Sequence, residues 1–326
     1  VNSLFYLLVC SEFNAYVGSL HMVVSVAEYL GQRTDSEINI VPVELGEPVS
    51  CPFMDRSCEK VLKNLQPVCA VRKTDNSVWI SCEHRLCSSR KKNKLGQSIG
   101  LVKHQQELLL HIAKFIYADE QLTLDEVGIK KEVTIPLPEA DHNYHADYVM
   151  RNFSSRGKVD EILLEMQGGG ETSNTGAITK HVANWAKMAL PTNKFLRENV
   201  AANTIETNAW RRQQEQFLVK GNVVDQTGGK IVFVVGSPLF DYLYKRLRDG
   251  NIGDLRQHNW TLCLLPIKEK TEQEIRSGKI PLTIDEELAL FTNYSTFIRV
   301  LTDQGFPCPA IFEGEFTLLN NTFKVV

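Results

Sequence analysis

The chain has 326 residues, enough for one large domain or for two domains of ordinary size. Its hydrophobic fraction of 43% and charged fraction of 23% are typical of globular proteins. A formal net charge of −3 excludes a uniformly basic nucleic-acid coat protein but leaves room for a basic cleft on an acidic body. No apolar run approaches the roughly 20 residues needed to cross a bilayer, so we expect a cytoplasmic protein with no membrane partner.

The N-terminal segment begins with the apolar stretch VNSLFYLLVC but has no positively charged region before it, unlike a signal peptide. Ordered patterning begins at Met22, so we expect residues 1–21 to be a non-native or disordered extension. An unsecreted chain would keep its eight cysteines in a reducing compartment, where a cysteine cluster indicates metal binding more often than disulfides.

The first expected elements are a helix over 22–33, where apolar residues recur at helical spacing, and a short strand over 38–43. An amphipathic helix over 101–120 follows. Further strands are expected at 132–137, 144–150, 161–167, 228–238 and 259–269, and further helices at 176–190, 208–220, 238–247 and 285–302. This order indicates an α/β (α+β) fold with a mixed central sheet flanked by helices.

Four cysteines follow one another in a C-x6-C-x10-C-x12-C arrangement: Cys51, Cys58, Cys69 and Cys82. Four thiolates within such a short segment suit a tetrahedral site for zinc or iron, which would brace a loop-rich segment without a core of its own. The alternative is four independent buried thiols. Cys87 is close enough to compete with Cys82 as a ligand, whereas Cys10, Cys263 and Cys308 are expected to be small core residues.

A second group of polar residues follows the apolar positions of the central strands. Glu165 and Gln167 end the strand 161–167 and share one face, because residues two apart in a strand point the same way. On the strand 144–150, Asp147 shares a face with His145. If these strands pair, Asp147 approaches Glu165, and two neighbouring carboxylates favour a cation between them. Mg²⁺ suits such a site and can activate a bound water for attack on a phosphodiester.

An acidic residue, a loop and then Glu-x-Gln is a variation on the PD-(D/E)xK nuclease pattern, with Gln167 in place of lysine. An amide cannot place a positive charge beside the attacking water, although it can hydrogen-bond or ligate metal through its carbonyl. More of the electrostatic stabilisation then falls on the metal ions, and an extra carboxylate, for which Glu132 is the candidate, would help. The alternative is a solvated strand end, because a glutamate before three glycines often has no chemical role.

Several basic residues are candidates for DNA contacts. Arg85, Arg90, Lys91 and Lys92 follow the cysteines and would lie near phosphates, or they form a solvated surface loop. Arg211 and Arg212 would read guanine in the major groove, or they lie on the exposed face of a helix. His145 and His181 are given no catalytic role, because a metal-dependent nuclease of this type needs no histidine.

The order of the segments CPF, SCEK, VCAV and CEHR, with Asp147 and a strand ending LLEMQ downstream, resembles the NotI-like type II restriction endonucleases. The segment VAEYLGQR resembles the family's helix before its cysteines, and Glu132 lies fifteen residues before Asp147, as an acidic residue does in that family. The resemblance keeps its order from about Val26 to Leu265. It departs in a shorter loop between Asp147 and Glu165, and in the segment GGGETSNTG, which lies near the DNA in such enzymes.

The resemblance implies a PD-(D/E)xK restriction-endonuclease-like fold, with a four-cysteine metal-binding lobe at 22–98 and a nuclease core at 99–326. It implies a homodimer that cuts double-stranded DNA at a palindromic site with Mg²⁺, and a separate cognate DNA methyltransferase. The four cysteines would bind a structural iron, and the active site would be formed by Glu132, Asp147, Glu165 and Gln167. Two other functions stay open: a non-catalytic, sequence-specific DNA-binding regulator, and a redox or iron sensor.

Overall fold

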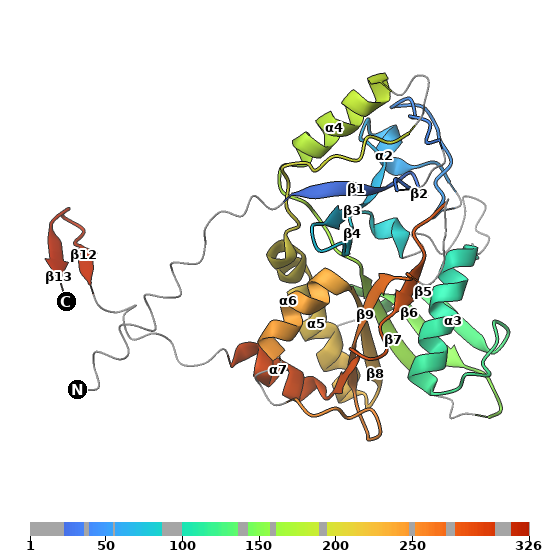
Figure 1. Cartoon of the computed structure of the whole chain (residues 1–326). Helices are drawn as coiled ribbons and strands as arrows, with labels where there is room; N and C mark the ends of the chain where they lie inside the picture. The colour runs from blue at the N-terminus through green and yellow to red at the C-terminus, as the bar shows by residue number, and fades with distance from the viewer. Residues whose placement is uncertain are drawn as a thin grey trace.

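A computed structural model describes the chain at residues 23–35, 39–54, 56–86, 100–135, 143–156, 161–188, 194–247, 252–271, 278–303 and 314–325. It has a small N-terminal sheet and a larger central sheet with helices on both sides (Figure 1). A short hairpin, β12 (Glu315–Thr317) and β13 (Phe323–Val325), pairs only within itself. Within these residues, no helix is long and apolar enough to span a lipid bilayer.

The central sheet has seven strands in the order β10-β9-β8-β7-β6-β5, with β11 also paired to β9. Its strands are β5 (Val127–Ile135), β6 (Tyr144–Asn152), β7 (Glu161–Gln167), β8 (Lys230–Gly236), β9 (Leu262–Glu269), β10 (Leu282–Ile284) and β11 (Leu290–Thr292). β5, β6 and β7 are antiparallel neighbours, and β7, β8 and β9 are parallel. The expected mixed sheet is therefore confirmed, and the expected strand at 161–167 has the same bounds as β7.

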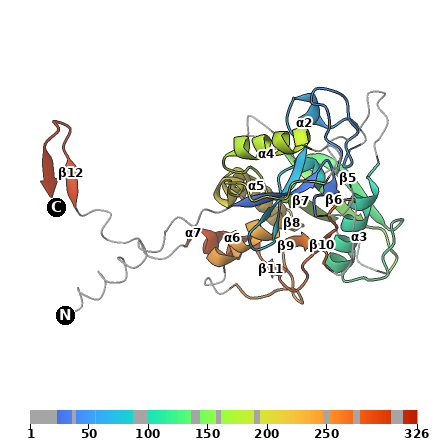
Figure 2. The same cartoon turned by 45° about the horizontal axis from the view of Figure 1, so that its top comes forward.

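Helices cover both faces of this sheet. α3 (Lys103–Tyr117) packs on one face, where its Ile112 shares a buried cluster with Leu164 and Val232. On the other face lie α5 (Glu206–Gln226), α6 (Ser237–Leu247) and α7 (Tyr294–Thr302) (Figure 1 and Figure 2). There Phe217 stacks on Phe233 with ring centroids 3.6 Å apart. The helix expected over 285–302 forms only in its last part, because the residues before it pair as β11.

The N-terminal sheet has the order β2-β1-β3-β4, with β1 (Val24–Tyr29), β2 (Gln32–Arg33), β3 (Val68–Lys73) and β4 (Val78–Ile80). The helix expected over 22–33 is wrong. Leu30 and Gly31 have positive φ values of 42° and 69° and turn the chain back on itself as a hairpin, whose first strand then pairs with β3. Residues 39–43, expected to be part of a strand, form none.

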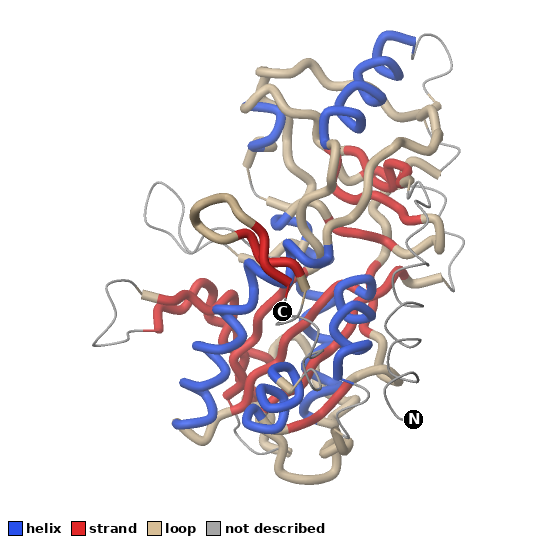
Figure 3. The backbone as a smooth tube through the Cα atoms, turned by 90° about the vertical axis from the view of Figure 1, so that its left-hand side faces the viewer, coloured by secondary structure: helices blue, strands red, loops and turns tan. Residues whose placement is uncertain are grey.

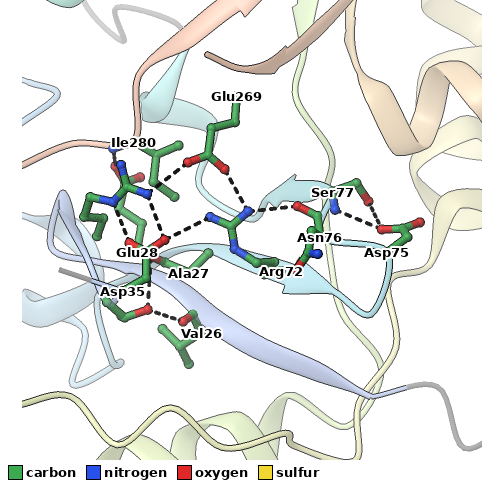
Figure 4. Close-up of polar contacts among 12 residues, drawn as sticks. Val26, Ala27, Glu28, Asp35, Arg72, Asp75, Asn76, Ser77, Glu269 and Ile280 are labelled. Carbon is green, nitrogen blue, oxygen red and sulfur yellow. Dashed lines mark hydrogen bonds and ion pairs between the residues drawn. The ribbon is translucent and has the colours of Figure 1, made fainter. Parts of the chain in front are cut away.

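The N-terminal sheet lies against one end of the central sheet (Figure 3) and is flanked by α2 (Glu59–Leu62) and α4 (Thr175–Met188). Ion pairs join the two sheets: Glu269 at the end of β9 accepts from Arg72 of β3 at 2.7 Å and from Arg33 of β2 at 3.2 Å. Figure 4 shows Arg72 between Glu269 and the backbone carbonyl of Asn76. A hydrophobic core that includes Val26 and Phe233 also runs through both regions.

Candidate active site

Three acidic residues occupy neighbouring positions on three adjacent strands. In the β5–β6 pair, Lys131 faces Tyr148 and Val133 faces Ala146, so Glu132 lies opposite Asp147. In the β6–β7 pair, the last paired position is Tyr148 opposite Leu164, and the next position in the same register places Asp147 opposite Glu165. The register of the central sheet therefore places these three acidic residues at facing positions of β5, β6 and β7.

Regular strand geometry is interrupted at these carboxylates. Glu132 has a φ of 46°, in the left-handed region that residues other than glycine seldom adopt. The Asp147 side chain takes over part of the backbone pairing, because its Oδ2 accepts the N–H of Met166 at 2.8 Å. Such strain costs about 1–3 kcal/mol per residue and is found mainly at functional sites. The irregularity coincides with the acidic residues, as expected of a functional site.

All four residues expected to form the active site line one cavity of about 510 Å³, here called the carboxylate cavity. Its walls come from β5, β6, β7, β8, α5 and the 3-10 helix η1 (Glu83–Arg85). The lining residues are Glu83, His84, Glu132, His145, Asp147, Glu165, Met166, Gln167, Arg212, Gln213, Gln216, Phe217, Lys220, Phe233 and Val235. The structure therefore brings Glu132, Asp147, Glu165 and Gln167 together.

Glu165 is almost fully buried in this cavity. Its Oε2 accepts from the Lys220 ammonium at 2.7 Å, while its Oε1 is buried with no hydrogen-bond partner among the described residues. Burial, and after it the nearby Asp147 charge, raise the pKa of Glu165 to about 8 against the opposing effect of Lys220. An unpaired buried carboxylate oxygen beside a second carboxylate is a suitable position for a divalent cation.

Lys220, which the sequence reasoning missed, comes from the middle of α5. Its side chain is 3% exposed and also donates to the backbone carbonyl of His145. A signal was present in the sequence, because Lys220 falls at helical spacing from the buried Phe217 and Val224 and thus on the apolar face of α5. A lysine on that face must be buried, and a buried lysine needs an acidic or polar partner.

Gln167 is held at both ends of its amide. Its Oε1 accepts from Gln213 of α5 at 2.7 Å, and its Nε2 donates to the backbone carbonyl of Gly169. Asn and Gln amide orientations are assigned from such networks. The orientation given by these bonds fixes Gln167 at the cavity wall.

The three glycines after Gln167 are packed rather than solvated. A Cβ on Gly168 would lie 2.8 Å from Ile80, and one on Gly169 would lie 2.6 Å from the backbone oxygen of Ile80. A Cβ on Gly236 would lie 2.0 Å from the backbone oxygen of Gly168. The chain leaves β7 through a narrow passage between β4 and β8, so the solvated strand end considered above does not apply here.

The four cysteines of the expected metal site gather in one buried cluster with Phe53, Met54 and Val61. Cys51 follows a bridge between Ser50 and Ser57, Cys58 precedes α2, Cys69 lies on β3 and Cys82 follows β4. Their thiols are free. The sequence spacing thus predicts the convergence of these residues, although they come from four separate turns and strand ends.

The cluster is not a formed coordination site. Across the described parts of the chain, no group of three or more His, Cys, Asp or Glu side chains is arranged so that it could hold a metal ion, and this applies to Glu132, Asp147 and Glu165 as well as to the four cysteines. Burial raises the pKa of Cys69 and Cys82, whereas a hydrogen bond from Cys51 lowers the pKa of Cys58 to about 6. In chemical type four buried thiols fit zinc or iron, but the structure shows the expected metal-binding lobe only as a cluster of thiols.

The expected DNA contact of Arg85 is wrong. The Arg85 side chain is 3% exposed, and its Nε donates to the fully buried Glu28 at 2.9 Å, so its charge is turned into the protein. Arg90, Lys91 and Lys92 lie outside the described residues, as do Met22, the segment 1–21 and the thiols Cys10, Cys87 and Cys308. Cys263 is fully buried in β9, which confirms it as a core residue.

The other expected polar contacts divide between surface and cavity. Arg211 is exposed on α5, while Arg212 lines the carboxylate cavity and forms an exposed ion pair with Glu171 at 2.6 Å. His145 is exposed and lines the cavity, and His181 donates from its Nε2 to the backbone carbonyl of Leu196 at 2.8 Å. Among the residues that the structure describes, neither histidine is hydrogen-bonded to a carboxylate of the site.

A second cavity, of about 500 Å³, adjoins the first. It is lined by the four cysteines and by residues 166–172, among others. It shares six lining residues with the carboxylate cavity: Glu83, His84, Met166, Gln167, Arg212 and Gln213. The two hollows together extend from the acidic residues to the N-terminal sheet.

A scan of the chain against protein-family models finds no match, and a search of curated protein sequences finds no significant similarity. The resemblance to NotI-like endonucleases therefore depends on the motif residues and their order alone.

Proposed function

We propose that this protein is a Mg²⁺-dependent endonuclease that hydrolyses phosphodiester bonds of double-stranded DNA, like the type II restriction endonucleases that its motifs resemble. The observation that carries this proposal is the convergence of Glu132, Asp147 and Glu165 on adjacent strands at one cavity, where Glu165 Oε1 is buried without a partner. Three carboxylates at one opening suit a hard cation, which could in turn bind a phosphate oxygen, far better than they suit a neutral substrate.

Asp147 and Glu165 would hold Mg²⁺, with Glu132 supporting a second ion or a bound water. A bound Mg²⁺ would supply charge neutralisation at the phosphate and would lower the pKa of a coordinated water. The protein's own residues set the geometry. The N–H of Met166 fixes the Asp147 carboxylate, and Gln213 fixes the Gln167 amide, which would orient the attacking water. Phe217 and Phe233 form an apolar wall that limits the entry of bulk water.

The finer features of the proposal come from the resemblance. They are a homodimer, a palindromic target and a separate methyltransferase that protects the host DNA. Dimerisation would place two carboxylate cavities on one duplex, as cutting both strands of a palindrome requires. Arg212, at the rim of the cavity, and the neighbouring Arg211 are the proposed DNA contacts on α5.

We also propose that Cys51, Cys58, Cys69 and Cys82 bind a structural metal ion, iron or zinc. The support is that four buried free thiols share one cluster in a loop-rich segment. Elemental analysis of the purified protein should find about one iron or zinc per chain, and only iron would give a coloured protein. Replacement of Cys58 and Cys69 by serine should remove the metal; full metal content in that double variant would exclude this site.

One observation favours a second candidate function. Lys220 already gives Glu165 a cationic partner, so the acidic residues would be inert in a DNA-binding regulator that does no chemistry. Such a protein would bind DNA with sequence preference but would leave it intact in the presence of Mg²⁺.

Incubation of the protein with plasmid or phage DNA and Mg²⁺ separates the two functions, since only the endonuclease gives discrete fragments. Glu165→Ala should abolish cutting while leaving DNA binding in Ca²⁺ intact. The matched control is Glu161→Ala on the same strand, whose side chain is 56% exposed and pairs with Arg151 at the surface. Wild-type protein that binds DNA and never cuts it, or Glu165→Ala protein that cuts as fast as the control, contradicts the proposed endonuclease.

A further inference from the structure

The Glu-x-Gln motif lacks the positive charge that a lysine would bring to the reaction. Gln167 stands at that position, and both ends of its amide are already hydrogen-bonded. Of the residues lining the carboxylate cavity, two have an arginine or lysine side chain, Arg212 and Lys220. Arg212 is 64% exposed and pairs with Glu171, so its charge is directed toward the rim. Lys220 is the cation inside the cavity.

The Lys220 ammonium is held between the two strands that carry the carboxylates. It lies 2.7 Å from Glu165 Oε2 on β7 and donates to the backbone carbonyl of His145 on β6, two residues before Asp147. Close packing of the helix sets this position, because a Cβ on the neighbouring Gly221 would lie 2.5 Å from the ring of Tyr294. The α5 helix therefore places a buried lysine beside Glu165, whereas β7 has a glutamine at the lysine position of the motif.

We propose that Lys220 replaces, from helix α5, the lysine that the strand motif lacks. This inference rests on the proposed endonuclease function. Without metal, the ammonium holds the Glu165 carboxylate next to Asp147 and offsets their mutual repulsion. With Mg²⁺ and DNA bound, Lys220 positions Glu165 and places a positive charge beside the scissile phosphate, where negative charge builds up during attack by water. Fixed charges of this kind act strongly in a cavity that excludes water.

The charge can be separated from the contacts by substitution. Lys220→Met keeps the length of the side chain and removes its charge, whereas Lys220→Gln keeps a hydrogen-bond donor and also removes the charge. Both variants should cut DNA at least 100-fold more slowly than the wild type, in line with the loss of one preorganised charged donor. Their binding of the same DNA in Ca²⁺ should stay within about threefold of the wild type, because Lys220 is buried and acts on the reacting phosphate.

Moving the lysine to the motif position gives the decisive test. The double variant Lys220→Met with Gln167→Lys should regain at least about tenfold in cutting rate, since the charge returns to the same cavity from β7. The matched control is Lys268→Met, which breaks an ion pair of the same 2.7 Å length with Asp285 outside the cavity. It should cut at the wild-type rate.

The outcomes distinguish this inference from the function on which it rests. If the wild type cuts and both single variants cut within threefold of it, Lys220 has no part in the reaction. If the single variants fold with wild-type melting temperatures but are inactive, and Gln167→Lys alone cuts while the double variant does not, Lys220 has a structural role and the charge replacement is wrong. A wild type that never cuts DNA refutes the endonuclease itself, and the Lys220 inference with it.

Discussion

Two buried ion pairs of this protein have the same chemistry but different surroundings. Glu28 and Arg85 join strand β1 to helix η1 at 2.9 Å, and Glu165 and Lys220 join β7 to α5 at 2.7 Å. All four side chains are less than 10% exposed. In the first pair the second glutamate oxygen accepts the N–H of Ile280 at 3.0 Å, whereas Glu165 Oε1 has no partner among the described residues.

The difference separates a structural pair from a functional one. Arg85 also donates to the carbonyl of Ile280 and lies over the ring of Phe53. Its planar guanidinium therefore forms hydrogen bonds at its edge and a cation–π contact on its face. Lys220 is a point charge, and its partner faces an open cavity and a second carboxylate. A satisfied pair holds elements together, while an unsatisfied one leaves a position that a ligand can fill.

The same substitution at both glutamates tests this comparison. Glu28→Gln should lower the free energy of unfolding by about 3–5 kcal/mol, because it leaves the Arg85 charge buried without a counter-charge. Glu165→Gln should cost less than about 1 kcal/mol, because it relieves repulsion with Asp147, which then balances the Lys220 charge. Only Glu165→Gln should abolish DNA cutting when the two are compared below their unfolding transitions.

Urea unfolding followed by circular dichroism measures both stabilities, and the plasmid assay measures cutting. An equal loss of stability in the two variants would mean that both pairs are structural. Cutting by Glu165→Gln at the wild-type rate would mean that the Glu165–Lys220 pair has no role in the reaction.

The passage between the two regions gives a second test. Gly168, just after β7, lies very close to Gly236. A Cβ added to Gly236 would lie 2.0 Å from the backbone oxygen of Gly168. Gly236→Ala should therefore cost about 1–3 kcal/mol through overpacking, and should slow cutting by displacing the end of β7. Gly176→Ala is the matched control, since nothing lies within 4 Å of its added Cβ in helix α4. It should gain up to about 1 kcal/mol.

Thermal and urea unfolding of the two alanine variants checks this expectation. A Gly236→Ala protein as stable and active as the control would show that β7 and β8 separate at little cost. The end of β7, and with it Glu165 and Gln167, would then be less rigidly placed than the packing indicates.

The central strands could be predicted because their residue pattern favours a strand over a helix. The strand around Asp147 alternates between buried and more exposed positions, and the short connection to the apolar strand that contains Glu165 favours antiparallel pairing, so the approach of the two carboxylates follows from the sequence. The N-terminal residues could not be assigned to a helix or a strand in this way. The apolar positions from Val24 to Tyr29 fit a helix as well as a strand that is buried on both faces, and the pairing with β3 decides between them.

The charged partners could not be predicted, because they meet across long stretches of chain. Lys220 lies 55 residues after Glu165, and Arg85 lies 57 residues after Glu28. In sequence Arg85 is a basic residue two positions before Cys87, which favours a DNA contact, and nothing near it marks Glu28 as its partner. Lys220 was the more accessible of the two, because its place on the apolar face of α5 already indicates a buried charge.

The smallest expected effect concerns acid sensitivity on the structural side of the comparison. His104 of α3 packs edge-on to Phe53, its Nε2 bonds the backbone carbonyl of Arg85 at 3.3 Å, and its Nδ1 is buried without a partner. Burial lowers the pKa of His104 to about 3, with the Arg85 and Lys279 charges contributing. Between that pKa and the ordinary value near 6.5, the unfolded chain binds the extra proton, so stability falls as the pH falls.

This single group should cost about 1 kcal/mol of unfolding free energy between pH 6.5 and pH 5.5. The variant His104→Phe keeps the ring contact with Phe53 and removes the titrating nitrogen. Between pH 6.5 and pH 5.5 its free energy of unfolding should therefore fall by about 1 kcal/mol less than that of the wild type. His258→Phe, at an exposed position, is the control and should follow the wild type. If His104→Phe shows the same acid loss as the control, the sensitivity arises elsewhere, and the region around Arg85 is no more acid-sensitive than the cavity around Glu165.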